Sequence, residues 1–161
     1  MKTRIFGILF LMVVMAVPAF AAYDMYLQIA GIAGVQSDAT HKDWLPVSEI
    51  QDNTVKPGGV ASLVINKPID GKSGSLYKDC LTATLRNYAT LDVCKDGILV
   101  YRTTMMEPVI TQIKPSFIKR DPNPQQELSF SFKTITWEFY SLDGKTITTR
   151  SGWDNQMKRA M

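Results

Sequence analysis

Alternation of apolar and polar residues dominates the chain from residue 23 onwards. In "YDMYLQIAG", every second residue is apolar (Met25, Leu27 and Ile29), which is the period of a strand with one buried face. Similar stretches predict further strands, which we place at residues 43–50, 60–68, 85–95, 98–106, 108–113, 127–141 and 145–153.

Turn and breaker residues separate these strands. Asp96-Gly97 is a preferred pair for a two-residue type I′ hairpin turn, and Asp143-Gly144 predicts a second hairpin. Pro46 places the strand at 43–50 at a sheet edge or bulge. The apolar parity changes within 127–141, which predicts a bulge near Lys133. The proline-rich stretch 114–126 predicts a long surface loop.

One helix is expected, over "SGSLYKDCLTATL" at residues 73–85. Leu76, Cys80 and Leu81 fall on one stripe, and Ser73 or Ser75 can cap the N-terminus. Many short antiparallel strands with one helix predict a mainly β fold, either a small β-barrel or a sandwich.

The first residues read as an export leader. Lys2 and Arg4 precede an apolar run, and Ala19, Ala21 and Ala22 supply the small residues of a cleavage region. We therefore expect a cleavable signal peptide at 1–21 and a single domain at 22–161. The alternative, an uncleaved anchor, is disfavoured because the run is short and Pro18 interrupts it. No stable membrane span is expected after cleavage.

Charge gives no sign of a nucleic-acid partner. Removing residues 1–21 takes away Lys2 and Arg4 and leaves 16 basic against 15 acidic residues. The pI of 8.8 therefore overstates the basicity of the mature chain. We expect no binding to nucleic acid, because no basic face or stripe stands out.

The sequence offers little catalytic chemistry. His41 is the only histidine, which excludes multi-histidine metal sites and weakens a Ser-His or Cys-His mechanism. No glycine-rich phosphate loop is present. The carboxylates are scattered, so a hydrolase using Asp92, Asp96 or Asp143 remains a third hypothesis. We expect no catalytic residue, no metal site and no cofactor.

Two further groups of residues carry open alternatives. Cys80 and Cys94 could close a structural disulfide, provided that the helix covers the outward face of the 85–95 strand; otherwise they are free buried thiols. Tyr26, Tyr88 and Tyr101 could form a ligand platform, although tyrosine is also common on strands for packing alone.

Three stretches carry a family resemblance. "YDMYLQIAGIAG" with "HKDWLPV", then "INKPIDGKSGSLYKDCLTA", and finally "ITWEFYSLDGKTITTRSGWDNQMK" follow one another in the order of the haemolysin-coregulated protein (Hcp) family. The chain resembles that family over essentially all of its mature length. The motif residues are Tyr23, Asp24, Met25, His41, Asp43, Trp44, Lys67, Pro68, Asp70, Gly152, Trp153 and Asp154.

The resemblance implies a small antiparallel β-barrel with one flanking helix that assembles into hexameric rings. In that family the rings stack into the tube of the bacterial type VI secretion system and can carry small effector proteins. A ring closes through one repeated heterologous interface and needs no catalytic residue.

Two features depart from the family pattern. Its tube subunits usually have no cleavable leader, and many have a long glycine-rich extension where this chain has "QDNTVKPGGVAS". We therefore expect an exported member, periplasmic or secreted in a Gram-negative bacterium, that is a non-enzymatic structural or carrier protein. The alternative is a monomeric exported binding module on the same scaffold.

Overall fold

The computed structural model describes residues 22–36, 38–52, 62–120 and 122–161. The predicted signal peptide and most of the stretch "QDNTVKPGGVAS" lie outside these ranges. The elements are β1 Tyr23–Ile29, β2 Leu45–Val47, β3 Glu49–Asp52, β4 Leu63–Pro68, α1 Ser73–Leu81, β5 Tyr88–Lys95, β6 Ile98–Met106, β7 Val109–Ser116, β8 Gln125–Ser131, β9 Thr134–Tyr140, β10 Ile147–Asp154 and β11 Arg159–Ala160.

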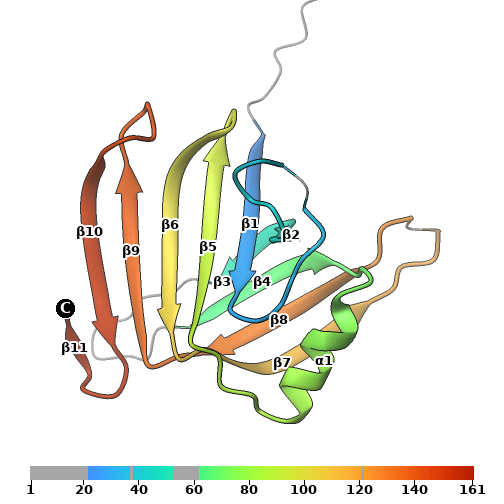
Figure 1. Cartoon of the computed structure of the whole chain (residues 1–161). Helices are drawn as coiled ribbons and strands as arrows, with labels where there is room; N and C mark the ends of the chain where they lie inside the picture. Colours follow the sequence, from blue (N-terminus) through green and yellow to red (C-terminus); the bar gives the residue numbers. More distant parts are fainter. Residues whose placement is uncertain (1–21, 37, 53–61, 121) are drawn as a thin grey trace, which may run out of the picture.

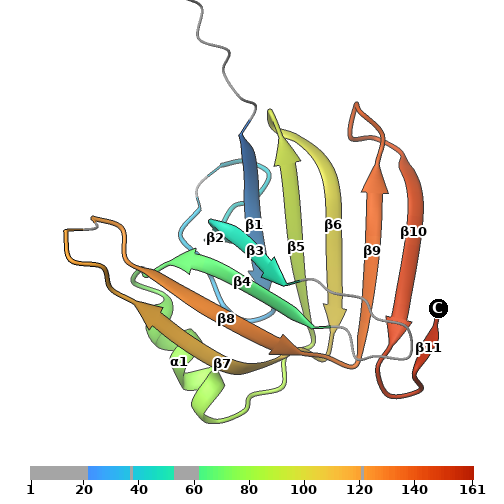
Figure 2. The same ribbon diagram turned by 180° about the vertical axis from the view of Figure 1, so that it is seen from behind.

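These strands form two antiparallel sheets. The larger has seven strands in the order β11-β10-β9-β6-β5-β1-β2, and the smaller has four in the order β3-β4-β8-β7. The smaller sheet crosses behind the larger one (Figure 1), and the opposite view brings it to the front (Figure 2). The predicted mainly β class is confirmed. The predicted barrel is corrected, because the strand pairings of the described residues do not close the two sheets into one.

The core fills the space between the two sheets. Leu27, Leu91 and Ile135 come from the larger sheet and Ile65 and Leu128 from the smaller, and all five side chains are inaccessible to solvent. Burying such side chains stabilises a fold by about 1.5–3 kcal/mol each. The inward parity predicted for the 23–29 strand is confirmed at Leu27.

The long strand predicted at 127–141 is two strands in two sheets. β8 belongs to the smaller sheet and β9 to the larger, and the chain passes between them at residues 132–133. The prediction of one strand with a bulge is therefore wrong. The apolar parity changes here because each strand faces the shared core from its own side. Phe130 and Trp137 are both buried, whereas Phe139 is 46% exposed.

The predicted hairpin turn at Asp96-Gly97 and the predicted edge position of Pro46 are confirmed. Asp96 and Gly97 both have positive φ, at 52° and 77°, as a type I′ turn requires. β2, which contains Pro46, is an edge strand of the larger sheet. The surface loop predicted at 114–126 is shorter than expected, since β7 and β8 pair as far as Ser116 and Gln125.

The helix starts at the predicted residue, but it ends earlier than predicted, and the predicted burial of Leu81 and capping by serine are wrong. Leu76 is fully buried, whereas Leu81, five residues further on and so about 140° around the helix, is 86% exposed. No side chain caps the first turn of the helix. The Ser73 hydroxyl instead accepts hydrogen bonds from the Asp70 N–H (3.0 Å) and from the buried Gln126 amide (2.9 Å). No helix in the described part of the chain is long and apolar enough to cross a membrane.

Candidate functional site

A row of alternating charges crosses the outer face of the seven-stranded sheet, on the side away from the core. Asp92 on β5 is the register partner of Arg102 on β6, Arg102 of Glu138 on β9, and Glu138 of Arg150 on β10. We call these four residues the polar row. Opposite charges on directly opposed residues stabilise neighbouring strands.

The inner pair of the row is buried at its acidic end. Arg102 Nε and Nη2 donate to the two Asp92 carboxylate oxygens, both at 2.7 Å. The Asp92 side chain is 2% exposed and that of Arg102 is 34% exposed. Hydrogen bonding to Asp92 raises the pKa of Arg102, so the guanidinium stays charged. A two-pronged geometry of this kind is among the strongest that side chains form.

The outer pair of the row is more exposed than the inner pair, chiefly at its arginine, because the Glu138 side chain is only 13% exposed. Arg150 donates to Glu138, and the Tyr140 hydroxyl donates to the same carboxylate at 2.9 Å. Partial burial opposes ionisation of Glu138, but these two hydrogen bonds outweigh it and leave its pKa below the ordinary value. The Arg150 side chain is 61% exposed.

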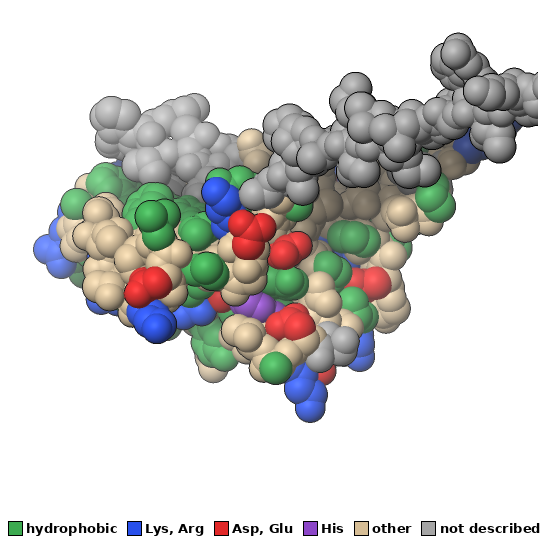
Figure 3. Space-filling model, turned by 90° about the horizontal axis from the view of Figure 1, so that it is seen from above, with side chains coloured by type: hydrophobic (Ala, Val, Ile, Leu, Met, Phe, Trp, Pro, Cys, Tyr) green, Lys and Arg blue, Asp and Glu red, His purple; other side chains and the backbone are tan. Residues whose placement is uncertain are grey.

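His41 closes over the inner end of the row. Its ring stacks on Tyr26, the register partner of Asp92, with centroids 4.1 Å apart, and meets Trp44 edge-on at 4.9 Å. Its Nε2 lies 3.1 Å from Asp92 Oδ2 and its Nδ1 lies 3.4 Å from Asp38 Oδ1. Figure 3, which views the molecule from above, shows the histidine with acidic side chains near it. The His41 ring is buried, which its polar surroundings in the sequence did not predict.

Two glycines let the segment between β1 and β2 fold back over the sheet. Gly31 has a φ of +77°, which favours glycine. At Gly34 a Cβ would lie 2.0 Å from the Trp44 carbonyl oxygen, so no side chain fits there. The Gly34 N–H instead donates to the Asp43 carbonyl at 2.5 Å. The chain therefore turns back towards the sheet before it reaches His41.

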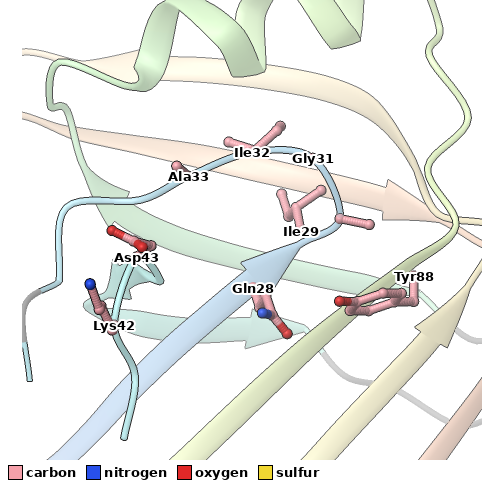
Figure 4. A pocket seen from close by; sticks show the side chains of 9 residues that line it. Gln28, Ile29, Gly31, Ile32, Ala33, Lys42, Asp43 and Tyr88 are labelled. Carbon is pink, nitrogen blue, oxygen red and sulfur yellow. The ribbon is translucent and has the colours of Figure 1, made fainter. Parts of the chain in front are cut away.

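An open groove of about 400 Å³ lies at the end of β1 (Figure 4). Its polar lining comes from Gln28, Lys42, Asp43 and Tyr88, and its apolar lining from the turn after β1. Lys42 and Asp43 are exposed, and Asp43 has a φ of 62°. Of the three tyrosines considered as a ligand platform, Tyr88 alone lines this groove.

The disulfide condition is not met. Cys80 lies on α1, which packs against β7 of the smaller sheet, whereas Cys94 lies on β5 of the larger sheet. Both are free cysteines in the structure. Burial raises the pKa of the Cys94 thiol to about 11, which makes it unreactive near neutral pH.

The motif residues before the helix build a second buried polar group. The Lys67 side chain is fully buried, and its Nζ donates to the Pro68 carbonyl (2.5 Å) and to Asp70 Oδ2 (2.8 Å). Burial lowers the pKa of Lys67, and Asp70 opposes that effect. Asp70 Oδ1 also accepts from the Lys72 N–H at 2.8 Å. These contacts position the chain for α1, and the Asp70 side chain is only 15% exposed.

The remaining motif residues lie at the two ends of the larger sheet. Tyr23 and Asp24 are exposed at the start of β1, and Met25 packs against the core. Asp154 Oδ1 accepts from the backbone N–H groups of Gln156 and Met157, both at 2.8 Å, which closes the turn before β11. Gly152 and Trp153 precede it on β10, where the Gly152 carbonyl accepts from the N–H of Met161.

The charged side chains of these sites pair with one another or with backbone groups. Among the described residues, no group of three or more His, Cys, Asp or Glu side chains could hold a metal ion.

The contacts of Asp92 with His41 and Arg102 were not predicted from the sequence, where Asp92 is one of several dispersed carboxylates. Position 100 is an extra residue in β6, and this bulge moves Arg102 opposite Asp92. A register counted from the Asp96-Gly97 turn alone would pair Asp92 with Tyr101.

The fold and its sites define a protein of two β-sheets, in which buried and paired polar groups join neighbouring strands and close turns. A family model described as "Type VI secretion system effector, Hcp" matches residues 26–139. The chain belongs to this family.

Solved structures agree with that assignment. Hcp1 from Salmonella typhimurium is 26% identical with a TM-score of 0.75, and the match covers 87% of this chain and 100% of that one. A type VI secretion system effector from Yersinia pestis is 22% identical with a TM-score of 0.74, covering 81% and 99% of the two chains. Hcp2 from Salmonella typhimurium is 23% identical with a TM-score of 0.69, covering 81% and 94%. The comparison with curated proteins finds no match.

Proposed function

We propose that this chain is an exported, non-enzymatic member of the Hcp family that builds a hexameric ring and works as a structural or carrier protein. The observation that carries the proposal is the family match over residues 26–139, together with a structural match that covers the whole of a related Hcp1 chain. The carried partners would be small effector proteins or other secretion-system components.

A free strand edge supports self-association. β11 pairs only with Trp153 and Asp154 of β10, so among the described residues the stretch from Ile147 to Ser151 has a neighbouring strand on one side alone. Those five residues are all exposed. Unpaired edges are either blunted or used for assembly.

Charge is distributed unevenly between the two ends of the larger sheet. Exposed residues at the β10–β11 end are mainly basic, and those at the β1–β2 end are mainly acidic, with Asp143 and Lys42 as the exceptions. The basic residues are Lys145, Arg150, Lys158 and Arg159, and the acidic ones are Asp24, Asp38 and Asp43. Opposite charges at opposite ends favour the head-to-tail contact that closes a ring.

Light scattering coupled to size exclusion tests the ring. We expect a mass about six times that of one mature subunit, as closed cyclic assemblies give. The double variant Arg150→Glu/Arg159→Glu should lower the assembled fraction, and Lys78→Glu on the exposed face of α1 is the matched control. A strict monomer at high protein concentration would refute the ring.

Export is tested separately by expressing the full chain in a Gram-negative host. We expect the protein in the periplasm or the medium, with Ala22 as its first residue. Replacing Ala19 and Ala21 with bulky residues should block processing. Protein that stays in the cytoplasm at full length would refute the predicted leader and leave the ring proposal intact.

The groove at the end of β1 favours a second candidate, a monomeric exported binding module. Its volume of about 400 Å³ suits a small ligand, and Gln28 and Tyr88 offer polar contacts. A thermal shift induced by glycan or cell-envelope fragments, in a protein that stays monomeric, would support this candidate over the ring. Substituting Tyr88 should abolish that shift.

A further inference from the structure

The loop that joins β7 to β8 carries an exposed apolar pair beside an exposed basic pair. Phe117 is 73% exposed and Ile118 is 67% exposed, and Lys119 and Arg120 follow them directly. We call these four residues the 117–120 tip. The loop extends away from both sheets in both ribbon views (Figures 1 and 2).

The base of this loop is firmly held. Ser116 and Gln125 are register partners, and the Ile69 N–H donates to the Pro124 carbonyl at 2.9 Å. The Gln125 amide also donates to the Asn123 carbonyl, at 3.0 Å. The tip is therefore presented to solvent by an anchored hairpin, and its two large apolar side chains are kept out of the core.

The cations of the tip are uncompensated among the described residues. Lys114, lower on β7, is paired with Glu127 at 2.9 Å. By contrast, neither Lys119 nor Arg120 forms an ion pair with a carboxylate of the described residues. Asp121 follows them in the sequence, so residues 117–121 have a net charge of +1.

We propose that the 117–120 tip docks on an anionic lipid bilayer. Phe117 and Ile118 enter the boundary between headgroups and acyl chains, while Lys119 and Arg120 contact the lipid phosphates. Apolar side chains flanked by cations suit such a surface, which attracts basic residues and accepts apolar ones. This function goes beyond the proposed ring.

The size of the tip favours a lipid surface over a protein partner. A stable protein interface takes about 20–30 residues from each side. Four residues at the apex of a narrow hairpin fall well short of that, whereas a bilayer adapts to a convex tip without a matching pocket. One tip binds weakly, and several tips carried by one assembly would bind more strongly through avidity.

Cosedimentation with vesicles tests the proposal, using protein purified after expression of the full chain. We expect binding to phosphatidylglycerol–phosphatidylcholine vesicles that falls with added salt, and much weaker binding to phosphatidylcholine alone. Phe117→Ser/Ile118→Ser should weaken binding by about tenfold or more. Lys119→Glu/Arg120→Glu should remove the preference for anionic vesicles.

Leu142→Ser is the matched control, since Leu142 is 95% exposed on the β9–β10 hairpin. It should bind vesicles as the unaltered chain does. Thermal unfolding and light scattering of each variant separate lipid binding from folding and assembly. The proposal is overturned if the unaltered chain does not bind anionic vesicles, or if the tip variants bind them as well as the control does. It is also overturned if the tip variants change the assembled mass without changing vesicle binding.

Discussion

The outer face of the seven-stranded sheet has a covered half and an open half, and the polar row runs through both. Over β1 and β5, the segment that carries His41 shields Asp92. Over β9 and β10, the Arg150 side chain is 61% exposed, and that of its partner Glu138 is 13% exposed. Both halves use the same arginine–carboxylate chemistry in the same register. The difference in burial predicts different consequences when each pair is broken.

Removing the inner arginine should have the largest effect. Arg102→Ala leaves Asp92 buried with only His41 facing it, and breaking a buried pair in this way costs about 3 kcal/mol of unfolding free energy. Urea unfolding monitored by tryptophan fluorescence measures the loss from the shift in midpoint at constant slope. Losses of equal size for Arg102→Ala and Arg150→Ala would mean that burial does not distinguish the two halves.

A substitution at His41 tests whether this residue holds the segment between β1 and β2 against the sheet. His41→Ala removes the stacking partner of Tyr26 and a hydrogen-bonding neighbour of Asp92, for an expected loss of about 2 kcal/mol. Hydrogen exchange should accelerate at the Gly34 and Asp43 amides, which bond within the covering segment. The exposed neighbour Lys42→Ala is the control, with a change below about 0.5 kcal/mol. If the global stability of His41→Ala falls without faster exchange there, His41 stabilises the core and does not hold the cover.

The covered half should also make stability depend on alkaline pH. Burial raises the pKa of Cys94 to about 11 from its usual value of 9.0. Because the folded state holds this proton more tightly than the unfolded state, the contribution is fully present below pH 9 and is lost as pH rises towards 11. Cys94→Ala should therefore lose less stability than the unaltered chain between pH 9 and 11, by about 2 kcal/mol at most. Parallel pH profiles for the two proteins would contradict this expectation.

Local sequence signals predicted much of the fold. Alternation located most of the strands, and Asp96-Gly97 located a hairpin turn, because both depend on neighbouring residues alone. The corner at residues 132–133 was missed, since a parity change reads the same for a bulge and for a change of sheet. The exposure of Leu81 was missed because residues five apart do not lie on one face of a helix.

The candidate site was less predictable than the fold. His41 and Asp92 are 51 positions apart in sequence, and the segment between β1 and β2 brings them together only after the sheet has formed. The bulge in β6 decides which residue faces Asp92, and no turn signal encodes it. The motif resemblance nevertheless included His41 and Trp44, so family similarity pointed to the covering segment, which the search for catalytic groups did not.

The smallest effect on stability is expected in the open half. Arg150→Ala removes an exposed partner of Glu138, and exposed pairs contribute about 0–1 kcal/mol, so unfolding should change by no more than about 0.5 kcal/mol. Glu138 keeps its hydrogen bond from Tyr140, which limits the loss further.

Light scattering on the same samples should show a larger change in assembled mass, because Arg150 lies on the free edge of β10, where a second copy would dock. An unfolding loss as large as that of Arg102→Ala would mean that the outer pair is part of the subunit's own stability. An unchanged assembled mass would instead mean that Arg150 is not part of the assembly surface. It would not affect the comparison of the two halves.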